Sequence, residues 1–249
     1  MNIIAHARNG FHTKFGVPRQ TTVDSRILTR IVFTPEYRNA EALRGIEQFS
    51  HLWIIWGFDD SNAPQTEGSQ WSPTVRPPRL GGNQRLGVFA TRSPNRPNRI
   101  ALSSVRLLRI EQTAEGHVLV VQGADMKNGS PVYDIKPYIP YTDSHPDAIG
   151  GFTDTTPAHK LNVVWTDKAN SDFQEIQKTG ANQTSSNLVT TREEINEILA
   201  ADPRPAYHND PQRIYGFEYN GCEIKFRVTQ EHIVYVTAVI ALEHIQQGE

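Results

Sequence analysis

The segment from residue 68 to residue 110 is dense in one kind of charged side chain. It holds eight arginines and no aspartate, glutamate or lysine, whereas the whole chain has a formal net charge of -2. They are Arg76, Arg79, Arg85, Arg92, Arg96, Arg99, Arg106 and Arg109. A guanidinium group is a planar fork that binds phosphate and stacks on nucleobases. Such a cationic segment in a near-neutral chain predicts a binding surface for an anion.

Within this segment, prolines stiffen a break between two predicted strands. The string TRSPNRPN at residues 91–98 contains Pro94 and Pro97, which fix the backbone φ angle and remove two N–H donors. A rigid loop that carries several donors suits a small polar ligand or a phosphate. The donors are Arg92, Ser93, Arg96 and Asn98. An exposed basic turn explains the same residues equally well.

A second group of chemically capable residues follows a predicted turn. Asp134 and Lys136 lie two residues apart, so a strand would place both on one face, and Tyr138 comes next in the same alternation. A carboxylate beside an ammonium group can act as a general base or as an orienting acceptor. Spacing alone favours a structural ion pair over this catalytic interpretation.

The string DPRPAY at residues 202–207 has two interpretations. It is either a stiff connector or a loop that presents Arg204 and Tyr207 for stacking on a base. Spacing alone favours the connector. Other side chains predict structure: Trp53 and Trp56 belong to an apolar run and indicate core positions.

Composition excludes several classes of protein. A single cysteine, Cys222, permits neither an internal disulfide nor a cysteine-based zinc site, and His51 and His145 have no partner at metal-ligand spacing. We therefore expect no metal and a reducing, cytoplasmic setting. No apolar run is long enough for a membrane helix, and the N-terminus resembles no targeting signal. The sequence also lacks dinucleotide-binding, P-loop and nucleophile-elbow motifs.

Short strands separated by Gly, Pro and Asn predict a mainly β N-terminal part. We expect strands at residues 3–7, 31–33, 51–58, 86–90, 102–110, 118–123 and 131–135, with 51–58 buried on both faces. One helix is predicted at 39–49, and a long loop at 59–85. Without alternating helices, an antiparallel barrel or sandwich is favoured over a doubly wound sheet.

The composition changes near residues 142–156, which predicts a domain boundary there. Beyond it we expect strands at 161–165 and 234–242, a helix at 167–178 and a capped helix that begins at the Thr191–Glu194 capping box. The Asn220–Gly221 turn predicts a hairpin of 214–219 with 222–228. The predicted division is a β domain at 1–150 and a small α+β domain at 157–249.

Several strings resemble the TrmO/TsaA-like (YaeB-type) family of tRNA adenine N6-methyltransferases, in that family's order. They are VPRQ (17–20), RGIEQFSHLWII (44–55), PTVRPPRLGGN (73–83), GVFATRSPNRPN (87–98), PVYDIKPYIPY (131–141) and DPRPAY (202–207). The resemblance implies a single-sheet β-barrel catalytic domain, a homodimer and S-adenosylmethionine as methyl donor. It implies methylation of N6 in N6-threonylcarbamoyladenosine, the base 3′ of the tRNA anticodon.

The resemblance also implies site residues. The cofactor contacts carried over to matching positions are Pro18, Arg19, Gln20, Asp59, Asp60, Arg92, Leu102, Asp125, Met126, Lys127 and Asn128. Asp59 and Asp60 replace a pair that is often His-Gln in the family. The residues expected to meet the anticodon stem-loop are Arg76, Arg79, Arg96, Arg99, Arg204 and Tyr207.

The reaction needs the acceptor nitrogen, methyl carbon and sulfur in line at roughly 3 Å. The N6 proton must also be accepted, and the candidates are Asp134, Tyr138 and, as an electrostatic partner, Lys136. Two alternatives stay open: a non-catalytic RNA-binding barrel that senses S-adenosylmethionine, and a methyltransferase that acts on a small molecule.

Overall fold

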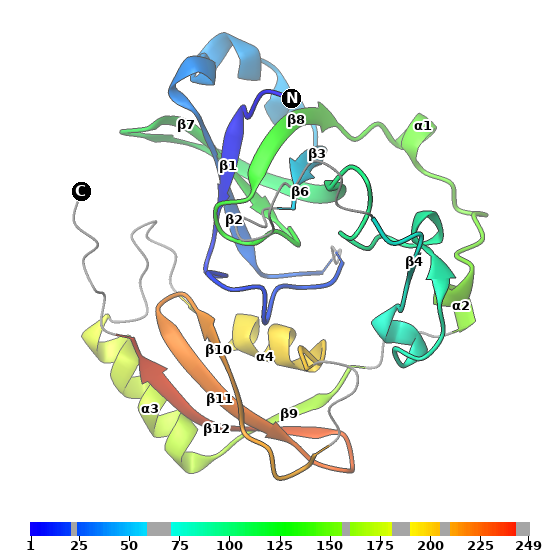
Figure 1. The fold of residues 1–249 in the computed structure, drawn as a ribbon. Helices are drawn as coiled ribbons and strands as arrows, with labels where there is room; N and C mark the ends of the chain where they lie inside the picture. The colour runs from blue at the N-terminus through cyan, green and yellow to red at the C-terminus, as the bar shows by residue number, and fades with distance from the viewer. Residues whose placement is uncertain (21–23, 59–70, 156–159, 181–189, 205–209, 243–249) are drawn as a thin grey trace.

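A computed structural model describes residues 1–20, 24–58, 71–155, 160–180, 190–204 and 210–242, and the statements below concern these residues. Two β-rich units follow each other along the chain (Figure 1). The N-terminal unit contains most of the strands, and the C-terminal unit combines a smaller sheet with two helices. The chain is therefore mainly β with a small α+β part, as the sequence predicts.

Six antiparallel strands of the N-terminal unit form a closed barrel. The order around it is β1-β2-β7-β6-β3-β8, and β1 pairs with β8 to complete the ring. The strands are β1 (Ala5–Arg8), β2 (Leu28–Phe33), β3 (His51–Gly57), β6 (Ile100–Thr113), β7 (Gly116–Gln122) and β8 (Pro131–Pro137). Inward-pointing side chains such as Ile31, Leu52, Ile54 and Leu119 fill its core. Of the two architectures left open by the sequence, the barrel is the one observed.

The remaining N-terminal elements are short. They are the strands β4 (Thr74–Val75) and β5 (Leu86–Gly87), the helices α1 (Pro140–Asp143) and α2 (Phe152–Thr155), and 3-10 turns at Pro35–Tyr37, Ala40–Leu43, Ile46–Gln48, Pro78–Leu80 and Val88–Ala90. The predicted strand at 86–90 is therefore only partly correct, because it passes into a 3-10 turn after two residues.

Two predictions about this unit are wrong. The segment 39–49 is not one helix, because Gly45 adopts a left-handed φ of 87° and separates two 3-10 turns. Strand β3 is not buried on both faces. Its burial alternates, so that Leu52 and Ile54 point inward while Trp53 remains partly exposed. The apolar run conceals this alternation, because Trp and Ile occupy the outer positions as well.

The C-terminal unit, which we call the C-terminal module, is a four-stranded sheet in the order β10-β11-β12-β9. Its elements are β9 (Asn162–Trp165), α3 (Asp167–Thr179), α4 (Arg192–Ala200), β10 (Tyr215–Tyr219), β11 (Cys222–Val228) and β12 (Ile233–Ala241). The predicted hairpin and capping box are confirmed: the Thr191 side chain accepts from the Glu194 N–H, and Glu194 accepts from the Thr191 N–H. Cys222 is fully buried, and burial raises the pKa of its thiol to about 11.

The core of the C-terminal module includes two residues from the first thirty of the chain. Phe11 and Ile27, both fully buried, pack with Tyr219, Ile195 and other module residues. They come from the connection between β1 and β2, which runs between the barrel and the module (Figure 1). The two units are therefore joined by side-chain packing as well as by the chain near residue 156.

Candidate functional site

Neighbouring barrel strands run in opposite directions, so three connections leave the same end of the barrel. They are residues 9–27 between β1 and β2, 58–99 between β3 and β6, and 123–130 between β7 and β8. We call this end the barrel mouth. In Figure 1 it faces the C-terminal module. Connections at a barrel mouth are a common place for a ligand, because a rigid scaffold positions them.

Nine of the eleven cofactor contacts suggested by the resemblance lie at this end of the barrel. Eight are in these connections, and Leu102 is near the start of β6. The nine are Pro18, Arg19, Gln20, Arg92, Leu102, Asp125, Met126, Lys127 and Asn128. Asp59 and Asp60 lie outside the described residues. The fold thus gathers at one end of the barrel residues that are more than a hundred positions apart in the sequence.

A hydrogen bond joins two of these loops. The Arg92 guanidinium donates to the Gln20 side-chain oxygen over 2.9 Å, and both side chains are exposed. The neighbouring Arg19 guanidinium donates to the backbone oxygen of Arg204 in the C-terminal module over 2.8 Å. The predicted cofactor loop at 17–20 therefore contacts both the TRS loop and the module.

The third connection is tied to the first by a buried amide. The Asn9 side-chain nitrogen donates to the Met126 carbonyl over 2.9 Å, and the Asn9 N–H donates to the Asn128 side chain over 3.1 Å. The Asn128 N–H donates to the Phe11 carbonyl over 2.8 Å. Met126 itself is fully buried in the barrel core, so only its backbone can face the mouth. Asn9 organises the site, and the sequence offers no signal for it beyond its place after a strand.

Asp125 is the acidic residue of this third connection. Its side chain accepts a hydrogen bond from the buried Ser103 hydroxyl, and Ser103 in turn accepts from the Trp56 indole nitrogen over 2.8 Å. This chain of polar groups runs from the barrel interior to the mouth. Ser103 therefore fixes the carboxylate of Asp125, a role that sequence reasoning missed.

The three candidate proton acceptors lie on the outer face of the barrel. Asp134 and Lys136 form an ion pair of 3.1 Å, with side chains 46% and 62% exposed. In the sheet, Leu102 pairs with Ile55 and Ile55 pairs with Asp134, so Asp134 shares a cross-strand row with Leu102. The structural ion pair favoured by spacing is present, and its exposure leaves Asp134 accessible.

Tyr138 lies further from the mouth. Its N–H donates to the His51 carbonyl at the start of β3, and its ring is 5.5 Å from that of Trp53. The Trp53 indole donates to Asp143 over 2.8 Å. Hydrogen bonds from the Ile139 N–H and from Trp53 lower the pKa of Asp143. This cluster holds the segment after β8 against the barrel, so Trp53 supports an outer surface rather than the core.

The arginines of the cationic segment differ in their surroundings. Arg76 and Arg79 are exposed beside β4, whereas Arg96 donates to the carbonyls of Thr91 and Ser93 within its own loop. Arg109 pairs with Glu111. The cationic segment therefore serves both as a solvent-facing charge and as a brace for its own loops.

The Arg204 guanidinium is engaged within its own loop. It makes two hydrogen bonds to Asp202, of 2.8 and 2.9 Å, and its side chain is 10% exposed. The bonds to Asp202 raise the pKa of Arg204. Phosphate contact by Arg204 would require this pair to open. Tyr207 lies outside the described residues.

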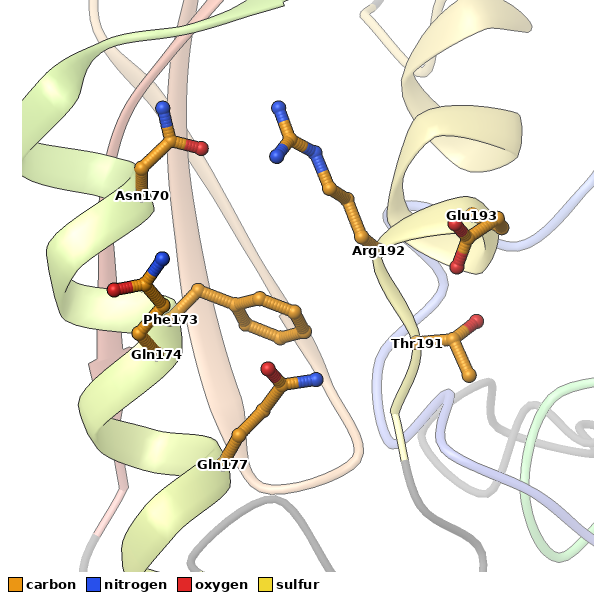
Figure 2. Close-up of a pocket in the computed structure, with 7 residues that line it drawn as sticks. All are labelled: Asn170, Phe173, Gln174, Gln177, Thr191, Arg192 and Glu193. Carbon is orange, nitrogen blue, oxygen red and sulfur yellow. The ribbon is translucent and has the colours of Figure 1, made fainter.

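A separate pocket lies in the C-terminal module. It has a volume of about 310 Å³ and lies between α3 and the start of α4 (Figure 2). Arg192 points across it toward Asn170, and its guanidinium lies 4.7 Å from the Trp165 ring centroid. No residue expected from the sequence to bind cofactor or RNA lines this pocket.

The described residues contain no group of three or more His, Cys, Asp or Glu side chains that could hold a metal ion. Nor does any described helix have the length and apolar character needed to cross a membrane.

Two family models match this chain. Residues 6–144 match the model of the tRNA-methyltransferase O N-terminal domain, and residues 158–242 match that of the TrmO C-terminal domain. An Escherichia coli protein named tRNA (adenine(37)-N6)-methyltransferase is 38% identical over 89% of this chain and 90% of its own length. A Pseudomonas aeruginosa protein, provisionally named S-adenosylmethionine-dependent methyltransferase RcsF, is 35% identical over 95% of each chain.

A solved structure described as TrmO from Pseudomonas aeruginosa superposes with a TM-score of 0.72 and 30% identity. The alignment covers 96% of this chain and 97% of that one, so the similarity extends through both the barrel and the C-terminal module. The chain belongs to the tRNA-methyltransferase O (TrmO) family.

Proposed function

We propose that this protein methylates N6 of adenosine 37 in tRNA, with N6-threonylcarbamoyladenosine as the substrate base and S-adenosylmethionine as the donor. The observation that carries the proposal is that the 17–20, 91–96 and 125–128 loops lie at one barrel mouth of a TrmO-family chain. Arg92 bonds to Gln20, and Asn128 bonds to Asn9 in the connection that carries the 17–20 loop. The names of the relatives support adenosine 37 and the donor.

The polar groups of the barrel mouth fit this donor. S-adenosylmethionine carries a carboxylate, an ammonium group, a sulfonium and an adenine, and when bound it supplies a methyl group on positively charged sulfur. Arg92 would hold the carboxylate and Asp125, fixed by Ser103, would hold a cationic group. Side-chain amides of Gln20 and Asn128 offer both donors and acceptors to an adenine edge. The described part of the mouth thus offers a partner for the carboxylate, for one of the two cationic groups and for the adenine.

Of the three candidate proton acceptors we favour Asp134. Adjacent strands lie about 4.8 Å apart, so the backbones of Asp134 and Leu102 are about 10 Å apart across β3. A ureido-linked N6 placed over this outer face could give its proton to the Asp134 carboxylate. Lys136, 3.1 Å from that carboxylate, would orient it. Tyr138 is four residues further along the chain, toward the other end of β3.

The choice of proton acceptor is tested by single-turnover kinetics. We expect Asp134→Asn to slow methyl transfer about 100-fold or more, the typical contribution of a general base. Tyr138→Phe, a matched change on the same outer face, should stay near the wild-type rate. A normal rate for Asp134→Asn would remove it from the reaction, and a slow Tyr138→Phe would transfer the role to Tyr138.

We further propose that four arginines contact the backbone of the anticodon stem-loop: Arg76, Arg79, Arg96 and Arg99.

We also propose that the protein acts as a homodimer. Large apolar side chains support a second copy: Phe89, Tyr141 and Ile149 are 71–91% exposed. Light scattering after gel filtration measures the mass directly. A monomer at micromolar concentration that retains full activity would contradict the dimer.

The overall proposal is tested with methyl-labelled S-adenosylmethionine and two tRNA preparations, one with and one without the threonylcarbamoyl group. We expect label at N6 of nucleoside 37 only in the modified tRNA. Label in both would contradict the modified substrate. Tight binding of donor and tRNA without transfer would favour a sensing role, and transfer to small molecules without tRNA affinity would favour the small-molecule enzyme.

A further inference from the structure

The loop at residues 17–20, which the proposed function assigns to the cofactor, is anchored on the C-terminal module at its start and through Arg19. Phe15, just before the loop, and Val17, its first residue, are half-buried against the module core. Gly16 is buried with a left-handed φ of 96°, and a Cβ there would lie 2.9 Å from the Phe217 ring. Only glycine permits the chain to pass this close to Phe217 in this conformation.

Both ends of the connection that carries this loop are anchored on the module as well. At the start, Phe11 packs against Tyr219 with ring centroids 4.8 Å apart, and the Asn220 N–H donates to the Gly10 carbonyl. At the end, Ile27 is fully buried in the module core, and the Arg26 N–H donates to Glu197 over 2.7 Å. On the barrel side, hydrogen bonds hold the connection near Asn9 and at Ile27, whose carbonyl accepts from the Gly123 N–H, and Gln20 accepts from Arg92.

We infer that the C-terminal module positions the cofactor loop, and that contact of the Phe217 ring with Gly16 fixes the position of the loop backbone relative to the barrel mouth. This inference rests on the proposed function, because it needs the 17–20 loop to contact S-adenosylmethionine. The Phe217 ring is 3% exposed and lies under Gly16, so it acts only through the backbone of the loop. Loss of this ring leaves the loop free to adopt conformations that cannot bind the donor.

If the donor site has its binding conformation only part of the time, the apparent Kd equals the intrinsic Kd divided by that fraction of time. If the loop of Phe217→Ala occupies its binding conformation about a tenth of the time, the Kd for S-adenosylmethionine rises about tenfold. The KM for the donor should rise in parallel while kcat is retained, because bound enzyme still has the correct geometry. A role in stability alone would lower Tm without moving Kd or KM.

The matched control is Phe173→Ala. Phe173 lies on α3, is 5% exposed in the same module core and packs on the Trp165 ring, whereas the atoms nearest to Gly16 all belong to Phe217. Calorimetry with S-adenosylmethionine on the full-length protein, well below both unfolding temperatures, gives the comparison. Phe217→Leu and Phe173→Leu leave smaller voids and allow the same comparison if the alanine variants do not fold. Phe217→Leu should bind the donor more tightly than Phe217→Ala.

Weaker donor binding in the Phe217 variants with unchanged binding in the Phe173 variants supports the inference. Equal Kd values for wild type and the Phe217 variants would overturn it, and so would equal losses in both series, since the effect would then be general destabilisation. Wild-type protein that binds no S-adenosylmethionine is a different result, and it overturns the proposed function itself.

Discussion

The two loops that meet through Gln20 and Arg92 are held in different ways. The 9–27 connection depends on residues far away in the sequence: Phe11 and Ile27 are buried among module residues near positions 195 and 219. In the 91–96 loop, Thr91, Ser93 and Arg96 bond to one another, and Pro94 restricts the backbone between them. One loop therefore depends on tertiary packing, and the other is largely self-supporting.

This difference has a consequence for stability and for binding. A change at an anchor of the 9–27 connection disturbs the junction of two cores, so it should affect the whole protein. A change in the 91–96 loop removes hydrogen bonds that are partly exposed and local, so its effect on folding should be small. Variants in the 9–27 connection therefore report mainly on folding stability, and variants in the 91–96 loop report mainly on ligand binding.

The largest effect is expected at Asn9, which is 3% exposed. Asn9→Ala removes the partners of the Met126 carbonyl, the Thr29 hydroxyl and the Phe11 N–H, all in the buried region. Each buried polar group left unpaired costs about 1–3 kcal/mol, so we expect a loss of about 3 kcal/mol in the free energy of unfolding. Chemical denaturation measures it.

The matched control for this prediction is Asn95→Ala in the self-supporting loop, where the Asn95 side chain is exposed. It should change the unfolding free energy by less than about 0.5 kcal/mol. Equal stability of the Asn9 and Asn95 variants would show that the 9–27 connection is not anchored as the structure indicates.

The same contrast explains which features the sequence could predict. The Thr191–Glu194 capping box and the Asn220–Gly221 turn are set by residues within four positions of one another, and both were predicted correctly. The stiffness of the TRSP loop is local too. The insertion of Phe11 into a core formed by residues beyond 160 has no local signal, since it depends on packing between distant segments.

Site residues divide along the same line. The family resemblance indicated the loop positions of Gln20, Arg92 and Asp125, but not the Ser103 hydroxyl that holds Asp125. A serine within a strand is too common to carry a prediction. The outward orientation of Trp53 was missed because the whole run 51–58 is apolar, and alternation cannot be read from residues of one type.

A second test uses pH, because only one of the two loops rests on a buried carboxyl group. Tyr219, which packs against Phe11, also hydrogen-bonds to Glu194, and burial raises the pKa of Glu194 above its ordinary value of 4.5. Folding therefore favours protonated Glu194. Its contribution to stability is full below pH 4.5 and is lost as the pH rises through the raised pKa.

Glu194→Gln keeps an acceptor oxygen for the Thr191 N–H and removes the titration. We expect the Tm of wild type to fall relative to that of Glu194→Gln between about pH 4 and pH 7. The exposed neighbour Glu193 supplies the control variant Glu193→Gln, which should follow wild type. The 68–110 segment contains no carboxylate, so the 91–96 loop has no titrating side chain of its own in this range. A constant Tm difference across this range would contradict the raised pKa.

The smallest effect on folding is expected in the self-supporting loop. Arg96→Ala loses bonds of 3.2 and 3.4 Å to the carbonyls of Thr91 and Ser93, which should cost about 1 kcal/mol or less. If Arg96 also meets a phosphate, the dependence of log Kd for tRNA on log salt should flatten by about 0.7. Arg44→Ala, an exposed arginine paired with Glu41 outside the mouth, controls for general charge loss. An unchanged salt slope with normal stability would leave Arg96 as a turn residue only. A flattened slope with normal folding would show that Arg96 contacts RNA independently of its bonds within the loop. No variant of the 9–27 anchors can show this, because each of them is expected to change the stability of the whole protein.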